Sequence, residues 1–301
     1  EISIWRKCTR SKMSITVELE YEYPATVGEG PIWDCQHEEL IWIDVLEGQI
    51  FFYSPLTKSQ RIVSVNDHVG AVAFDQNYDL VIAQRDGISQ YSRSSNQISY
   101  IKKVIESPDI RFNDGSVDKF GRFVVGSMGY EPTGDTGTLY SYSLYGEPKV
   151  LLPKVGISNG ICWNSDSTRM YYIDSLTQSI QFFGYDLENG EISNGRELVK
   201  FPESEGTPDG MTIDTEGNLW VAMWGGAQIV QLNPSGQIMR RIPLPVTNVT
   251  SLTFGGPELN ILYITTARYS LSDAMLEKEP LAGSLFKIEG VAQGFLENCM
   301  K

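Results

Sequence analysis

Long apolar stretches are missing from this chain of 301 residues. Its longest apolar runs, such as "FVVGSM" and "LYITTA", are far shorter than the ~20 residues that cross a bilayer. Basic side chains are also scarce, because 24 Lys and Arg stand against 38 Asp and Glu, for a formal net charge of -14. Nucleic acids and anionic membranes are bound mainly through Lys and Arg. We therefore expect a soluble protein whose partners include neither a nucleic acid nor a membrane.

Cysteine is rare as well, and the cysteines lie far apart without CxxC spacing, at Cys8, Cys35, Cys162 and Cys299. This spacing argues against a disulfide framework and against a thiolate metal site. The opening residues "EISIWRKCTRSK" have no apolar core or cleavage site of a signal peptide, and Met13 is a candidate start. We interpret residues 1–15 as a leader or disordered segment, and we expect a cytoplasmic protein.

What the sequence does contain is a repeat. A polar anchor residue followed by a β-rich run recurs six times, as in "VDKFGRFVVGS" and "IDTEGNLWVAM". The anchors are separated by 41, 43, 46, 50 and 41 residues and are Asp34, Asp75, Asp118, Asn164, Asp214 and Gly255. Each unit has the pattern of short strands broken by Gly, Asn, Asp and Pro, and only residues 271–279 have the pattern of a helical turn or two.

Repeats of roughly 40 to 50 residues with four strands each are typical of β-propeller blades. The sequence therefore predicts an all-β protein with a single six-bladed β-propeller over residues 16–290, followed by a C-terminal tail at 291–301. We expect residues 16–22 to pair beside 283–289 and close the ring, because a sheet edge would otherwise stay open. A pair of irregular β-sandwiches is the alternative.

Five residues before each anchor, the innermost strand of a blade should enter the central channel. The residues at these positions are Glu29, Gly70, Asn113, Asn159, Asp209 and Thr250. An unpaired polar group is costly in such a place, yet five of the six positions carry a side-chain oxygen. Convergence of Glu29, Asn113, Asn159 and Asp209 on one axial divalent ion would explain the pattern.

All-oxygen ligands suit calcium, magnesium or manganese, while zinc and iron(II) stay open. The alternative is that Asn and Asp before Gly are ordinary turn formers.

Several motifs carry a family resemblance. "GEGPIW", "RFNDGSVDKFGRFVVGSM", "ISNGICWNSD" and "TPDGMTIDTEGNLWVAMWGG" resemble the senescence-marker-protein, regucalcin and gluconolactonase family, and the likeness runs from residue 17 to 289. Among its members the chain looks most similar to bacterial sugar-acid lactonases. The resemblance implies a six-bladed propeller with one divalent metal ion on its axis, which hydrolyses aldonolactones to aldonic acids.

By motif matching, the resemblance places the metal ligands at Glu29, Asn159 and Asp209. It places the substrate contacts at Arg111, Asn113 and Glu131, and Asn113 also approaches the metal in some relatives.

Lactone opening develops negative charge on the carbonyl oxygen, which a divalent ion would stabilise as a Lewis acid. A carboxylate would take the proton of the attacking water, and Asp209 is the candidate catalytic base, a role that the resemblance also suggests. Arg111 offers a fork of donors for sugar hydroxyls, and Asn113 offers both a donor and an acceptor. We expect the partner to be a small sugar lactone such as gluconolactone or xylonolactone, and the chain to be a monomer or a weak homo-oligomer.

Two other functions stay open. Related propellers with a similar calcium site hydrolyse organophosphates or aryl esters, which would need an apolar mouth, and other propellers only bind a metal or a protein. A Ser/His/Asp triad is poorly supported, because no GxSxG motif is present. Of the two histidines, His37 lies in a predicted turn, and His68, two residues ahead of Gly70, is either at the pocket rim or on the surface. Trp224 is a candidate to line the pocket, and we expect Trp33, Trp163 and Trp220 to pack between blades.

Overall fold

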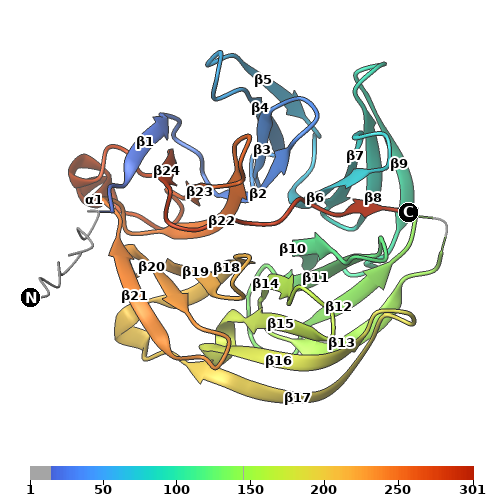
Figure 1. Ribbon diagram of the computed structural model, residues 1–301. Helices are drawn as coiled ribbons and strands as arrows, with labels where there is room; N and C mark the ends of the chain where they lie inside the picture. The colour runs from blue at the N-terminus through green and yellow to red at the C-terminus, as the bar shows by residue number, and fades with distance from the viewer. Residues whose placement is uncertain (1–14, 145) are drawn as a thin grey trace, which may run out of the picture.

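The protein is a wheel of six β-sheets arranged around a common centre (Figure 1). The structure is a computed structural model and describes residues 15–144 and 146–301. Within this part of the chain, each sheet has four antiparallel strands that follow one another from the centre of the wheel to its periphery. The second sheet gains a fifth strand from the C-terminus. The predicted six-bladed, all-β propeller is therefore confirmed. We number the blades 1 to 6 in chain order.

The strands fall into four positions within the blades. The inner strands are β2 (Gly28–Asp34), β6 (Val69–Asp75), β10 (Ile110–Val117), β14 (Ser158–Trp163), β18 (Thr207–Ile213) and β22 (Val249–Gly255). The second strands are β3 (Glu39–Asp44), β7 (Leu80–Gln84), β11 (Phe123–Gly129), β15 (Arg169–Asp174), β19 (Leu219–Trp224) and β23 (Ile261–Thr266).

The third strands are β4 (Gln49–Tyr53), β8 (Gly87–Ser92), β12 (Gly137–Tyr142), β16 (Ser179–Asp186), β20 (Gln228–Leu232) and β24 (Leu285–Glu289). The outer strands are β5 (Gln60–Ser64), β9 (Gln97–Lys103), β13 (Lys149–Val155), β17 (Glu191–Lys200), β21 (Ile238–Pro243) and β1 (Glu18–Tyr21).

The ring closes through β1. Inner strands of neighbouring blades contact one another all the way round, and β22 of blade 6 contacts β2 of blade 1. The N-terminal strand β1 pairs antiparallel with β24, with Glu18 opposite Lys287 and Leu19 opposite Phe286. The expected pairing of residues 16–22 beside 283–289 is confirmed, and it covers the outer edge of β24.

The repeated aspartates hold the turns between inner and second strands. Asp214 accepts a hydrogen bond from the backbone N–H of Asn218 at 2.8 Å and one from Trp220 Nε1 at 2.9 Å. Asp118 accepts from Arg122 Nε at 2.8 Å and from Tyr185 Oη at 2.6 Å. The spacing of the sequence repeat therefore reflects one type of aspartate-stabilised turn that is used in successive blades.

Large aromatic side chains pack at the blade interfaces. Trp33 of blade 1 stacks on Tyr263 of blade 6 with ring centroids 5.9 Å apart. Trp220 of blade 5 meets Phe254 of blade 6 edge to face, also at 5.9 Å. Offset stacks and edge-to-face pairs are the favoured arrangements of aromatic rings, so these contacts tie neighbouring sheets together.

Every inner strand has a register shift at its channel position. The shifts fall within residues 29–32, 69–71, 112–115, 159–161, 208–211 and 249–251. A bulge bends a strand and redirects the side chains beside it. Six bulges at one level can therefore turn the side chains of five channel residues toward the axis, the sixth residue being Gly70.

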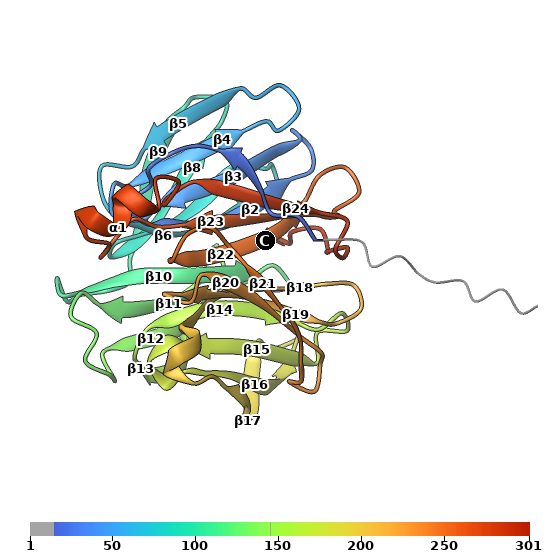
Figure 2. The same cartoon turned by 90° about the vertical axis from the view of Figure 1, so that its left-hand side faces the viewer.

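We call the face where the inner strands begin the mouth face, and the opposite face the anchor face. The helix α1 (Asp273–Lys278) lies in the connection between β23 and β24, and Figure 2 shows it projecting at one face of the wheel. The short 3-10 helices η1 (Ser175–Thr177) and η2 (Glu203–Glu205) lie in other connections. In residues 15–144 and 146–301, no helix is both long enough and apolar enough to cross a membrane.

The C-terminal segment lies across the anchor end of the channel. Its strand β25 (Cys299–Met300) pairs in parallel with Phe74 and Asp75 at the end of β6. Asn298 Nδ2 donates to the carbonyl oxygen of Val117 in blade 3 at 2.9 Å. The last residues are thus held by two neighbouring blades.

Candidate functional site

Four side chains from four blades gather at the level of the bulges. Glu29, Asn159 and Asp209 are buried, with exposed fractions of 9%, 5% and 6%, and Asn113 is partly buried. They come from β2, β14, β18 and β10, respectively.

A chain of hydrogen bonds links three of these blades. Arg111 Nη1 donates to Asn113 Oδ1 at 2.7 Å, and Asn113 Nδ2 donates to Asn159 Oδ1 at 2.9 Å. Asn159 Nδ2 donates to Ser175 Oγ at 2.8 Å, and Ser175 Oγ donates to the carbonyl oxygen of Pro208 at 2.7 Å. The chain therefore runs from Arg111 in blade 3 to the residue before Asp209 in blade 5. It fixes the orientation of both amides.

The carboxylates of the site repel one another. Burial, and secondly the charge of Asp114, raises the pKa of Glu29 to about 8, although the Gly30 N–H at 2.8 Å and Arg111 oppose this rise. Burial, followed by the charges of Glu29 and Asp114, raises the pKa of Asp209 well above its ordinary value. Burial likewise raises the pKa of Asp114 to about 6. Three acids thus share one poorly solvated space, with Arg111 as the basic side chain that lowers the pKa of both Glu29 and Asp209.

This donor set fits a hard divalent cation. Buried like charges are costly unless a positive charge is placed between them, and carboxylate and amide oxygens are the ligands that such ions prefer. The Asp209 carboxylate makes no hydrogen bond with any residue in the described ranges, so its oxygens are free for a ligand. Within the same ranges, His, Cys, Asp and Glu alone form no group of three that could hold a metal ion. A site here would therefore need the amide of Asn159 beside the two acids.

The remaining two channel positions have other roles. An added Cβ on Gly70 would lie 2.5 Å from the carbonyl carbon and oxygen of Phe112, so glycine is required for blades 2 and 3 to approach. Thr250 Oγ1 donates to the carbonyl oxygen of Gly28 at 2.6 Å and so joins blade 6 to blade 1. Neither position supplies a free oxygen to the centre.

The expected substrate residues lie toward the mouth face. Arg111 is buried, and its Nη1 is held by Asn113 and by the Phe112 carbonyl oxygen at 2.9 Å. Glu131 follows the end of β11 and is exposed. Its carboxylate makes no hydrogen bond within the described chain, so the structure brings Arg111 to the site more closely than Glu131.

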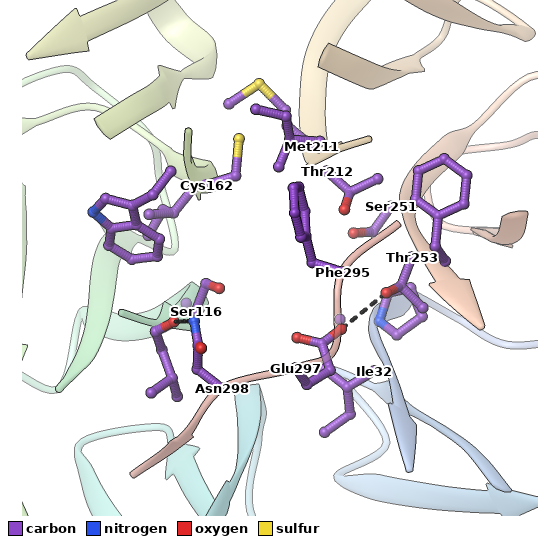
Figure 3. Close-up of a pocket in the computed structure, with 18 of the residues that line it drawn as sticks. Ile32, Ser116, Cys162, Met211, Thr212, Ser251, Thr253, Phe295, Glu297 and Asn298 are labelled. Atoms are coloured by element: carbon purple, nitrogen blue, oxygen red, sulfur yellow. Dashed lines mark hydrogen bonds between the residues drawn. The ribbon is translucent and has the colours of Figure 1, made fainter. Parts of the chain in front are cut away.

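A channel cavity of about 440 Å³ lies on the other side of the ligand ring. Its lining includes Asp114, Thr212 and Ser251, and the C-terminal residues Phe295 and Glu297 bound it toward the anchor face. Figure 3 shows the Phe295 ring pointing into this space toward Met211. Because its lining contains neither Arg111 nor Glu131, we do not assign the substrate to it.

Two contributors to the site were not identified from the sequence. Ser175 orients Asn159 but lies in η1, outside the strand repeat, and Ser251 lowers the pKa of Glu29 by hydrogen bonding. The position of Ser251, directly after the channel residue Thr250, is the signal that could have pointed to it.

Comparison with known proteins identifies the family of this chain. The sequence model of the SMP-30/Gluconolactonase/LRE-like region matches residues 27–268. The chain belongs to the SMP-30/gluconolactonase family.

Curated relatives of this family member cover nearly its whole length. Regucalcin of Danio rerio is 36% identical over 281 residues, which are 92% of this chain and 95% of that protein. A Bacillus subtilis protein, YvrE, provisionally named a sugar lactone lactonase, is 34% identical over 279 residues, or 92% of this chain and 96% of its own.

Solved structures agree with the fold. A luciferin-regenerating enzyme superposes with a TM-score of 0.89 at 30% identity, covering 96% of this chain and all (100%) of that chain. The calcium-binding protein regucalcin from Agrobacterium tumefaciens has a TM-score of 0.92 and covers 95% of this chain and 98% of its own. At 23% identity, this second likeness shows the fold alone.

Proposed function

We propose that this member of the SMP-30/gluconolactonase family is a metal-dependent hydrolase that opens sugar lactones to aldonic acids. The observation that carries the proposal is the pair of buried acids Glu29 and Asp209, which come from blades 1 and 5. Their negative charges repel each other, and a cation bound between them would compensate both. The metal ligands proposed are Glu29, Asn159 and Asp209. Calcium, zinc, manganese, magnesium and iron(II) are the candidate ions, and the names of the relatives, which include a calcium-binding protein, fit a divalent metal.

A bound divalent ion would supply Lewis-acid polarisation of the lactone carbonyl. The chain's own residues would do the rest. Asp209, whose pKa is raised by burial and by Glu29, would accept the proton of the water that attacks the carbonyl carbon. The ring C–O bond then breaks, and the alkoxide that leaves takes up a proton to become a hydroxyl of the open aldonic acid.

Arg111 and Asn113 would hold the substrate. Arg111 uses Nη1 for internal hydrogen bonds, and its Nε and Nη2 make no hydrogen bond with the described residues. Those N–H groups can be given to sugar hydroxyls or to the ring oxygen. Glu131, exposed beyond the end of β11, is the third proposed substrate residue. These polar substrate residues favour polyol lactones over aryl esters.

The test is acid release from gluconolactone and xylonolactone by the full chain, measured above the spontaneous rate. We expect turnover that a chelator abolishes and that single added ions restore to different extents. Asp209→Ala should remove turnover while circular dichroism stays that of the folded protein. Turnover that survives in this variant would refute the assignment of Asp209. Absence of turnover in the wild type with every ion would favour a non-catalytic metal-binding propeller.

A further inference from the structure

A second layer of side chains lies above the ligand ring, toward the mouth face. In each blade, the residue two positions before the channel residue precedes the bulge and lies further toward the mouth face. These residues are Val27, His68, Arg111, Ile157, Thr207 and Asn248. His68 therefore occupies in blade 2 the position that Arg111 occupies in blade 3. The backbone supports this phase, since the N–H of Arg85 donates to the His68 carbonyl oxygen at 2.8 Å and continues the ladder of β6 and β7.

All four polar side chains in this layer make hydrogen bonds within the protein. Thr207 Oγ1 accepts from Gln178 Nε2 at 2.9 Å, and Asn248 Nδ2 donates to the Tyr269 carbonyl oxygen at 2.9 Å. Arg111 and His68 differ, because each keeps nitrogen atoms that bond to no residue in the described parts of the chain. These two neighbours make one polar wall of the channel mouth, contributed by blades 2 and 3.

Tyr130 fixes the ring of His68. The Tyr130 hydroxyl lies 2.6 Å from His68 Nδ1, and the two rings meet edge to face with centroids 5.5 Å apart. The guanidinium carbon of Arg111 lies 6.0 Å from the centre of the Tyr130 ring. With Nδ1 occupied by Tyr130, the ring of His68 has Nε2 left to offer a ligand.

The charges around His68 keep it neutral near pH 7. Burial lowers its pKa, Arg111 and Arg85 lower it further, and Asp67 and Glu47 offset part of this effect. A neutral imidazole gives or takes one hydrogen bond at Nε2, according to its tautomer, and a sugar hydroxyl can serve as either partner. Arg111 can only donate hydrogen bonds, so His68 would add a possible acceptor to this polar wall.

We propose that His68 is a substrate-binding residue that recognises a hydroxyl group of the sugar lactone through Nε2, with Tyr130 as the residue that positions its ring. The inference rests on the proposed lactonase function and adds a determinant of its specificity. It follows that His68 should matter for lactones that carry hydroxyl groups and not for lactones that lack them.

The experiment crosses variants with substrates, using the full chain loaded with the ion that restores most activity. For gluconolactone, we expect His68→Ala to raise KM roughly three- to tenfold, the usual worth of one hydrogen bond, and to leave kcat within about twofold. For δ-valerolactone, which has the same ring size and no hydroxyl group, KM and kcat should not change. Tyr130→Phe should give a smaller rise in KM, of about two- to threefold, for gluconolactone only.

His37→Ala is the matched control, since His37 is the second histidine and lies on the anchor face, bonded to Asp34. It should leave both substrates unaffected. Having two histidines also allows a readout without turnover. In proton NMR of the ion-loaded wild type, gluconate should shift the imidazole signal of His68 and leave that of His37 in place.

The outcomes separate the two proposals. If the wild type opens neither lactone, the lactonase function fails, and the inference fails with it. If the wild type is active but His68→Ala loses the same factor on both lactones, or the gluconate titration leaves the His68 signal in place, the inference alone is overturned. A specific rise in KM for gluconolactone together with the NMR shift supports it.

Discussion

Replacing Glu297 by glutamine should stabilise the protein at alkaline pH and leave it unchanged at acidic pH. Glu297 lies in the C-terminal segment and lines the channel cavity, where its carboxylate accepts a hydrogen bond from Thr253 Oγ1 at 3.0 Å (Figure 3). Burial raises its pKa from 4.5 to about 7, and the hydrogen bond from Thr253 opposes this rise. Between pH 4.5 and about 7 the folded protein thus keeps a proton that the unfolded chain has lost. The contribution of Glu297 to stability therefore falls as the pH rises through this window and is constant above it.

The size of the effect follows from the same interval. Each pH unit is worth about 1.4 kcal/mol, which gives about 3 kcal/mol as an upper limit. The side chain is partly exposed, and solvent screening reduces the expected effect to about 1 to 2 kcal/mol. Urea unfolding followed by tryptophan fluorescence at pH 5 and pH 8.5 measures the difference between Glu297→Gln and wild type. Other titrating groups cancel in that difference. A difference that stays constant with pH, or that shrinks at pH 8.5, would refute the reasoning.

Three further predictions concern the channel. Calcium binding at pH 7 should release protons, because burial raises the pKa of Glu29 to about 8 and that of Asp209 well above its ordinary value. Calorimetry in two buffers of different ionisation enthalpy should therefore give unequal heats of binding, and equal heats would contradict this. Arg111→Ala should raise KM for sugar lactones roughly tenfold with little effect on δ-valerolactone, and an unchanged preference across a lactone panel would count against its role. Gly70→Ala should lower the free energy of unfolding by about 2 kcal/mol or more, because its Cβ would lie 2.5 Å from the Phe112 carbonyl group; a wild-type urea midpoint would show that the backbone yields easily.

The blade count could be predicted because one physical device repeats. Asp118 and Asp214 each satisfy several donors at the turn after an inner strand, so the residue type returns at every blade that uses the turn. Where another residue type replaces the aspartate, the anchor position still lies at the same place in the blade. Asn164, for example, replaces aspartate and accepts from the Arg169 N–H at 2.8 Å. Phase counted from these anchors then located the channel positions without any three-dimensional information.

Other features depend on contacts that no local pattern records. Ser175 reaches Asn159 from a 3-10 turn, and the equivalent position of blade 1 holds Val45, which has no hydroxyl group. The C-terminal segment is placed by long-range bonds, such as that of Asn298 with Val117 across 181 positions of sequence. Trp163 meets Tyr185 of its own blade with ring centroids 5.6 Å apart and shares a core cluster with Val124 of blade 3. Periodicity predicts the level at which a side chain lies and not the partner it finds there.

The first and last strands of the described chain overlap around the ring. The first strand, β1, belongs to blade 6, and the last, β25, belongs to blade 2, so blade 1 is straddled by both. Each joint is short, with three paired positions for β1 and two for β25. Because the two joints lie on opposite sides of blade 1, a force applied to either end of the described chain loads one joint while the other still holds the ring closed.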